Sequence, residues 1–187
     1  IKEPTDQYGD DEATYRHLIA ELPRIKPRLG DLTHALPSLL KQKQEMATQT
    51  LQLLGRPPLL IDGYMEIGST GRCVGALRRK VTMRGRTLLL NDVAPTFSVT
   101  DMVERGSPVM VGEFMALDDY APLSAEQVPG ASLDLVSCYI GLHHADPARL
   151  PAFLASIGRV LRPGGRFILR DHDVATPAMD NFVSLAH

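Results

Sequence analysis

Side chains capable of acid–base chemistry follow two apolar stretches of this sequence. His143 and His144 come just after the apolar run of residues 133–140, and the cluster Asp171-His172-Asp173 ends a second run. Histidine titrates near neutral pH, so either member of the pair can take a proton from a hydroxyl or an amine. The competing interpretation is that the pair is structural or lines a ligand pocket. Adjacent residues at a strand end point in different directions, so we expect one ring to face a cleft and the other the interior.

The cluster at residues 171–173 has the composition of a metal site but not its geometry. Three adjacent residues of an extended chain point in different directions and do not converge on one ion. Capping of the strand end, or the shaping of a pocket, explains the cluster better, and no metal site is expected. Cys73 and Cys138 are the only cysteines and lack metal-ligand neighbours. They are predicted to be reduced and buried, which suits the cytoplasm.

A glycine-containing loop carries a second set of candidate residues. Glu66 is followed at residues 68–71 by Gly-Ser-Thr-Gly, between an apolar run and a helical stretch. Such a loop lets a ligand approach the backbone, and the N–H groups of the helix start can bind a polar group. Asp92 ends the next apolar run, where an acidic side chain can accept hydrogen bonds from both hydroxyls of a ribose. The alternatives are an ordinary strand-to-helix turn and a capping Asp.

Alternating strands and helices are predicted to position these residues. The run at 133–140 predicts a buried strand, Asp146-Pro147 begins a helix, and residues 163–165 (Pro-Gly-Gly) end it. Residues 166–170 then form another strand. This order is a βαβ unit with parallel strands.

The alternation extends upstream. Strands are predicted at residues 61–67, 86–91 and 109–111, and helices at residues 71–83 and 95–105. Together with the βαβ unit they predict an α/β domain, a parallel sheet covered by helices.

The N-terminal third is predicted to be a helical extension, residues 1–58. It contains a short amphipathic helix at 11–22 and a longer helical region at 31–54, which Pro37 breaks or kinks. The sheet domain then occupies residues 59–187.

Three motifs follow one another in the second half of the chain. They are Leu133-Asp134-Leu135-Val136, Leu142-His143-His144, and Arg-Val-Leu-Arg-Pro-Gly-Gly at residues 159–165. Together they resemble class I S-adenosylmethionine-dependent methyltransferases, type 11 among them. The resemblance implies a Rossmann-like, doubly wound, mostly parallel sheet that begins with the strand order 3-2-1-4-5 and continues with strands 7 and 6. Only 14 residues follow Asp173, which is too few for strands 6 and 7, so these two are expected to be missing here. It also implies S-adenosyl-L-methionine as the cofactor and methyl transfer to an acceptor, expected to be a small molecule, with a protein acceptor as the alternative.

In that family the loop after the first strand has the pattern acidic-x-Gly-x-Gly-x-Gly. Glu66 and Gly68 match it, whereas Thr70 and Arg72 stand where the family has its second and third glycines. Gly71, which lies between these two positions, gives the turn some of the backbone freedom that the two missing glycines would provide. By resemblance, Glu66 lies near the methionine amino group of the cofactor and Gly68 lines the cofactor.

The resemblance assigns further roles. Asp92 binds the ribose, and Gly112-Glu113-Phe114 resembles the Gly-Asp-Ala that contacts the adenine. A surface Glu beside a core Phe is the alternative for this last match. The candidate catalytic residues are His143 and His144. The candidate cofactor-binding residues are Glu66, Gly68, Ser69, Gly71, Asp92, Glu113, Phe114 and Tyr139.

Bulk properties narrow the choice of partners. The chain has 187 residues and a formal net charge of −2, which gives no footprint for nucleic acid. No apolar run has transmembrane length and no signal peptide is evident, so no membrane partner is expected. Residues 176–186 are predicted to form one last helix. The fifth strand is then expected at a sheet edge, covered by a second copy in a homo-oligomer or by further chain.

Two other functions fit parts of the pattern. A catalytically silent member of the fold, acting as a scaffold or interaction module, is consistent with the altered glycine loop. A nicotinamide-dependent oxidoreductase is consistent with an acidic residue after the second strand. The Leu-His-His and Arg-Pro-Gly-Gly segments count against the oxidoreductase.

Overall fold

The computed structural model of the chain describes residues 16–17, 36–55, 60–139, 141–171 and 176. The chain divides into two compact units, Ile1–Lys41 and Gln42–His187, and the sheet belongs to the second. Helices were predicted at residues 11–22 and 176–186, and most of both segments lies outside the described residues. His172 and Asp173 also lie outside them. In the described part of the chain, no helix is long and apolar enough to cross a membrane.

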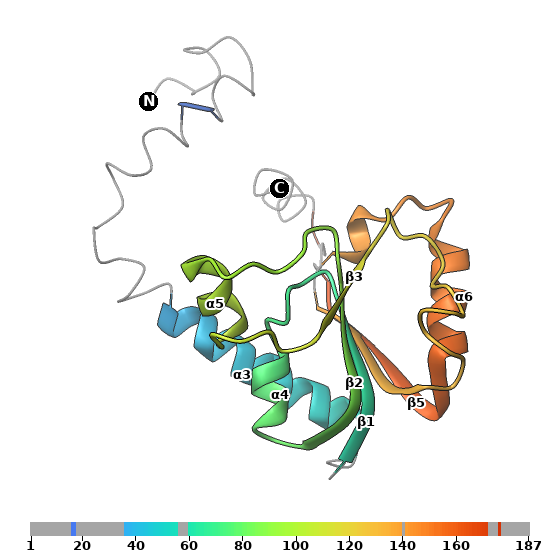
Figure 1. The fold of residues 1–187 in the computed structure, drawn as a ribbon, viewed down its shortest axis with the longest axis horizontal. Helices are drawn as coiled ribbons and strands as arrows, with labels where there is room; N and C mark the ends of the chain where they lie inside the picture. Colours follow the sequence, from blue (N-terminus) through green and yellow to red (C-terminus); the bar gives the residue numbers. More distant parts are fainter. Residues whose placement is uncertain (1–15, 18–35, 56–59, 140, 172–175, 177–187) are drawn as a thin grey trace. The chain divides into compact units, whose positions relative to one another are not determined.

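Five parallel strands form one sheet in the order β3-β2-β1-β4-β5, which confirms the predicted order (Figure 1). The strands are β1 (Leu60–Ile67), β2 (Thr82–Asn91), β3 (Glu113–Ala116), β4 (Leu133–Cys138) and β5 (Leu161–Leu169). The chain runs outward from β1 to β3 and then returns to β4, so the strand order reverses between β1 and β4. Ligands of such sheets bind at the carboxyl ends of the strands near this reversal. Among the described residues β5 pairs only with β4, and the cover expected for its other edge stays a prediction.

Helices cover both faces of the sheet (Figure 1). They are α3 (Leu36–Leu53), α4 (Val74–Arg78), α5 (Val99–Arg105), the 3₁₀ helix η2 (Leu142–His144) and α6 (Leu150–Val160). Phe153 and Ile157 of α6 pack on the face that carries Met65. Residues of α3 and α4 pack on the opposite face, which carries Tyr64 and Leu135. Because both faces are covered, the strands appear in the sequence as continuous apolar runs.

Two predicted helices are shorter than expected. The helix at 71–83 shrinks to α4, because β2 already begins at Thr82, paired with Leu60 of β1. The helix at 95–105 begins only at Val99, where the Ser98 side chain accepts a hydrogen bond from the backbone N–H of Asp101. That bond is a typical N-cap and fixes the start of α5.

The third strand was predicted in the wrong place. Val109 and Met110 are exposed, and the strand that pairs with β2 is Glu113–Ala116, in which Met115 is buried. The strand follows Gly112, which packs so closely on β2 that a Cβ atom there would lie 2.8 Å from the carbonyl oxygen of Thr87. Pairing with β2, and not local apolar content, sets the position of this strand.

Two proline-containing segments were expected to break regular structure. Pro37 lies in the first turn of α3, where a proline displaces no intrahelical hydrogen bond. Residues 31–35, where the predicted helical region begins, lie outside the described residues. Residues 163–165 were predicted to be a turn but lie within β5. A register shift opposite them, between Leu133 and Leu135, lets β4 and β5 stay paired on both sides of the glycines.

Arg162 joins three strands at the amino edge of the sheet. Its Nη1 donates to Asp134 Oδ1 at 2.9 Å and to the carbonyl oxygen of Asp62, and its Nη2 lies 3.4 Å from Asp62 Oδ2. The backbone N–H of Asp62 donates to Asp134 Oδ2 at 2.7 Å. These contacts tie β1, β4 and β5 together at the edge opposite to the candidate site.

Candidate functional site

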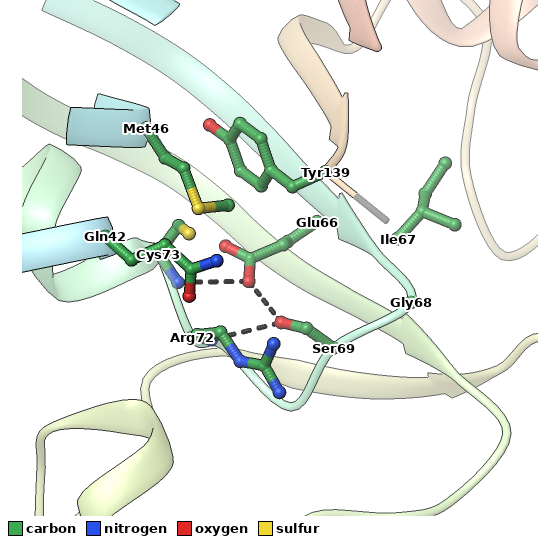
Figure 2. Close-up of a pocket in the computed structure, with 9 residues that line it drawn as sticks. All are labelled: Gln42, Met46, Glu66, Ile67, Gly68, Ser69, Arg72, Cys73 and Tyr139. Carbon is green, nitrogen blue, oxygen red and sulfur yellow. Dashed lines mark hydrogen bonds between the residues drawn. The ribbon is translucent and has the colours of Figure 1, made fainter. Parts of the chain in front are cut away.

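Glu66 is the buried centre of the loop that follows β1. Its carboxylate accepts hydrogen bonds from the Tyr64 hydroxyl at 2.9 Å. It also accepts from the backbone N–H of Cys73 at 3.1 Å and from the Ser69 hydroxyl (Figure 2). Burial raises the pKa of Glu66, while these three donors act in the opposite direction. The Ser69 oxygen in turn accepts from the backbone N–H groups of Gly71 and Arg72, both at 3.0 Å. Through these hydrogen bonds, the Glu66 carboxylate fixes the shape of the loop.

Two glycines give the loop its path. Gly68 has φ +77° and lies exposed at the carboxyl end of β1, with its N–H bonded to the carbonyl oxygen of Leu90 at 2.8 Å. Gly71 has φ +99°, and a Cβ atom there would lie 2.3 Å from Val111 Cγ2. Positive φ and this close approach both require glycine at position 71. The shifted glycine expected from the sequence thus has the conformation that the turn needs.

A small pocket lies over Glu66, between this loop and α3 (Figure 2). Its volume is about 20 Å³, which is room for about one water molecule. Gln42 and Met46 of α3 close one side, and Arg72 and Tyr139 line the other parts. The pocket as it stands is too small for a group larger than a water molecule.

Buried polar contacts hold α3 in this position. The Tyr139 hydroxyl at the end of β4 lies 2.9 Å from Thr50 Oγ1 of α3. Lys43 of α3 is 3% exposed, and its ammonium group donates to the carbonyl oxygens of Val103, at 3.2 Å, and Glu104. Burial lowers the pKa of Lys43. A cation is favourable at these last carbonyl groups of α5, where the helix dipole is negative.

Asp92 is exposed just beyond the carboxyl end of β2. Within the described ranges, no hydrogen-bond partner of its carboxylate is found, so the group is available to a ligand. Val93, next in the chain, exposes 67% of its surface and offers an apolar contact at the same edge. The position matches the one expected for a carboxylate that binds ribose hydroxyls.

Glu113 and Phe114 do not lie at this edge. They stand at the amino end of β3, where Glu113 is level with Leu88 and pairs with Arg86 at 2.8 Å. The structure therefore does not bring them together with Asp92, which follows the opposite end of β2.

The carboxyl end of β3 carries a turn that sequence analysis missed. Asp118, Asp119 and Tyr120 follow one another with φ values of +48°, +51° and +58°, a region that non-glycine residues rarely occupy. The Tyr120 hydroxyl donates to the carbonyl oxygen of Gly141, and its ring meets Phe153 edge to face at 5.4 Å. Burial raises the pKa of Tyr120 to about 12. The two adjacent aspartates were the available signal, and the misplaced third strand hid it.

His143 and His144 lie together in the 3₁₀ helix η2. Both are exposed, and their ring centroids are 4.1 Å apart. The prediction that one ring faces the interior is wrong, because η2 turns the chain where an extended strand end was expected. His143 Nδ1 lies 2.6 Å from Asp171 Oδ1, and the His143 backbone N–H donates to Asp171 Oδ2 at 3.2 Å.

In the part of the chain that the structure describes, no group of three or more potential metal ligands occurs. Cys73 and Cys138 are buried and do not form a disulfide, and burial raises the pKa of the Cys138 thiol to about 11. The site therefore consists of a glycine-containing loop, an exposed carboxylate and a histidine–aspartate pair, all at the carboxyl edge of one sheet.

Comparisons with known proteins agree with this geometry. A family model described as a methyltransferase domain matches residues 67–169, which include most of the sheet. No curated protein sequence matches the chain. Among solved structures, the SeMet-substituted CurJ carbon methyltransferase has a TM-score of 0.53 at 15% identity, covering 97% of this chain and 53% of that one.

A second similar structure comes from Methanococcus maripaludis and is assigned to the S-adenosyl-L-methionine-dependent methyltransferases. Its TM-score is 0.50 at 14% identity, covering 80% of this chain and 64% of that one. At such identities the likeness concerns the fold alone. The chain spans between about half and two thirds of the length of these two proteins.

Proposed function

Because the chain belongs to the methyltransferase domain family, we propose that it transfers a methyl group from S-adenosyl-L-methionine to a small-molecule acceptor. S-adenosyl-L-methionine is the cofactor of this family. The observation that carries the proposal is the meeting, at one sheet edge, of the loop at Gly68, the carboxylate of Asp92 and the side chain of His143. The net charge of −2 supports a small-molecule acceptor over a nucleic acid.

The residues at this edge fit the cofactor in their chemistry. Gly68 is exposed with positive φ and would let the cofactor approach the backbone. The carboxylate of Asp92 would accept hydrogen bonds from the ribose hydroxyls. Glu66 and Ser69 would act through the loop, whose backbone they order, and Gly71 would keep its turn.

Two further residues complete the proposed cofactor site. Tyr139 would line it from the end of β4, beside the loop. Asp118 is exposed at the carboxyl end of β3 and would face the adenine in place of Glu113 and Phe114, which stand at the other end of that strand.

The cofactor, when bound, supplies a sulfonium methyl group with a good leaving group. The chain's own residues would then align the acceptor with the methyl group and exclude water. His143 and His144 are the proposed catalytic side chains, since they lie at the edge where the acceptor would approach and can take up a proton.

Calorimetric titration of the chain with S-adenosyl-L-methionine, S-adenosylhomocysteine and NAD tests the proposal. We expect both sulfur-containing nucleosides to bind at one site per chain and NAD not to bind. Binding of NAD alone would replace the proposal with an oxidoreductase.

A catalytically silent module is the second candidate, and one observation favours it. The pocket over Glu66 holds only about 20 Å³, because Gln42 and Met46 close it. If none of the three compounds binds, the silent module becomes the better interpretation.

The two buried, free thiols of Cys73 and Cys138 support a reducing compartment, such as the cytoplasm, for the proposed activity. In an oxidising compartment, free cysteines are less common than disulfides. Fractionation of cells that produce the protein would test this assignment.

A further inference from the structure

Asp171, two residues beyond the end of β5, holds His143 of η2 by two contacts. One carboxylate oxygen lies 2.6 Å from Nδ1 of the ring, and the other accepts from the backbone N–H of the same histidine at 3.2 Å. The side chains of His143 and Asp171 remain 30% and 20% exposed. A single carboxylate therefore fixes both the backbone and the ring of His143 while the ring still reaches solvent.

The position of Asp171 is itself fixed by the sheet. The backbone N–H of Arg170 donates to the carbonyl oxygen of Cys138 at 2.9 Å, which continues the pairing of β4 and β5 up to the residue before Asp171. Burial is the main cause of the raised pKa values of Cys138 and Tyr120, and the negative charge of Asp171 adds to both. The aspartate is thus part of the rigid edge of the sheet.

This geometry selects one tautomer of His143. A carboxylate only accepts hydrogen bonds, so the ring nitrogen 2.6 Å from it must carry the proton. In the neutral ring, Nδ1 is then the donor and Nε2 keeps its lone pair. A histidine held in this way can serve as a general base through Nε2.

We propose that Asp171 is a positioning residue that presents Nε2 of His143 as a general base, and that the methyl acceptor therefore carries a proton on the atom that becomes methylated. This inference rests on the proposed function. The acceptor class is an alcohol, a phenol, or a neutral nitrogen compound with an N–H bond, such as a primary or secondary amide or amine. A tertiary amine or a thioether has no proton to lose and would gain nothing from the base.

The step balances with the groups named. Nε2 takes the proton from the acceptor as the acceptor's electron pair forms the bond to the methyl carbon. The bond from that carbon to sulfur breaks, and sulfur keeps the electron pair. The imidazolium, which the Asp171 carboxylate stabilises, then gives its proton to water.

Nitrogen-15 NMR of histidine-labelled protein tests the positioning directly, without turnover. We expect neutral His143 to show mainly the tautomer with the proton on Nδ1, although free neutral histidine prefers the proton on Nε2. Asp171→Asn should shift His143 towards a mixture of tautomers. Asp146→Asn, a change at an exposed aspartate whose carboxylate accepts from the Ala148 N–H, should leave it unchanged. Nε2–H as the main tautomer in the unmodified protein would overturn the proposal.

Turnover supplies the second arm. S-adenosylhomocysteine release is measured with a panel of phenols, alcohols and amines, and with tertiary amines and thioethers for comparison. His143→Gln and Asp171→Asn should lower kcat on the first group, the former by on the order of 10²- to 10⁴-fold, with unchanged calorimetric affinity for S-adenosyl-L-methionine. If the unmodified chain does not bind S-adenosyl-L-methionine, the proposed function is wrong. If it binds the cofactor but methylates only tertiary amines or thioethers, the role of His143 as a general base is wrong.

Discussion

Gly71 and Val111 approach so closely that a Cβ atom on residue 71 would lie 2.3 Å from Val111 Cγ2. Val111 is buried beneath the loop that follows β1. The loop after β1 therefore packs directly on the core of the sheet at Gly71. The shape of this loop depends on the absence of a side chain at position 71.

Gly71→Ala should lower the free energy of unfolding by on the order of 1–3 kcal/mol. The new Cβ atom would clash with Val111, and alanine is strained at the φ of +99° that the loop has here. Urea unfolding measures the change. Gly158→Ala is the matched control, because it lies within α6 with no atom within 4 Å of the added Cβ. That control should gain roughly 0.5–1 kcal/mol. When Val111→Ala is already present, Gly71→Ala should lower the free energy of unfolding by less, because the clash is gone and only the backbone strain remains. An equal loss with and without Val111→Ala would show that the clash with Val111 does not contribute.

Glu66 should make the protein lose stability as the pH rises. Burial raises the pKa of Glu66 in the folded state above its unfolded value. Its contribution is therefore fully present below the unfolded pKa of about 4.3 and is lost as pH rises through the folded pKa. The difference in unfolding free energy between the unmodified protein and Glu66→Gln should fall as the pH rises above about 4.3.

Asp101→Asn provides a control of opposite sign for that series. Hydrogen bonds from Thr96 lower the pKa of Asp101, so its contribution is present above the unfolded pKa and is lost as pH falls through the folded one. The difference in unfolding free energy between the unmodified protein and Asp101→Asn should rise with pH. The rise should be slight, because the Asp101 carboxylate is exposed. Parallel curves for the two variants would contradict both assignments.

Asp92→Ala should weaken binding of S-adenosyl-L-methionine by on the order of 1–3 kcal/mol, because two hydrogen bonds to the ribose are lost. The unfolding curve should not change, since the side chain is exposed. Glu113→Ala removes an exposed carboxylate at the amino end of β3 and should leave the affinity as it was. Calorimetry on the two variants decides the matter. A loss confined to Glu113→Ala would move the site to the other end of the sheet.

Arg162→Ala should destabilise the fold by on the order of 1–3 kcal/mol without changing cofactor affinity. The change leaves the carboxylates of Asp62 and Asp134 without their shared cation at the amino edge. Arg166→Ala is the control, because its guanidinium is exposed and, among the described residues, donates to the nearby carbonyl groups of Gly164 and Gly165. Equal melting temperatures for the two variants would show that the contacts of Arg162 contribute no net stability.

The sheet could be predicted from the sequence because both of its faces are covered. Buried parallel strands give continuous apolar runs, and four of the five strands lie where such runs occur. The third strand could not be found in this way. Val109 is apolar yet exposed, and only pairing with β2 shows that the strand lies at Glu113–Ala116.

The candidate site was predictable in outline only. Residues at the ends of β1, β2 and β4 were named correctly as lying at one edge, because parallel strands end together. The contact between His143 and Asp171 joins residues 28 apart in the sequence, and it depends on a 3₁₀ turn that no local pattern indicated. The role of Lys43 was hidden as well, since a lysine on a helix usually lies at the surface.

The buried ammonium of Lys43 also bears on which part of the chain can fold by itself. It is the donor for carbonyl groups at the end of α5, and its neighbours Met46 and Ala47 belong to one core with α4 and β1. A fragment cut at residue 59 would keep every strand but lose that donor and one wall of the core. We expect such a fragment to expose apolar surface and bind a hydrophobic dye, whereas a fragment that begins before α3 unfolds as one cooperative unit. Amide hydrogens in the second half of α3 should then exchange as slowly as those of β1.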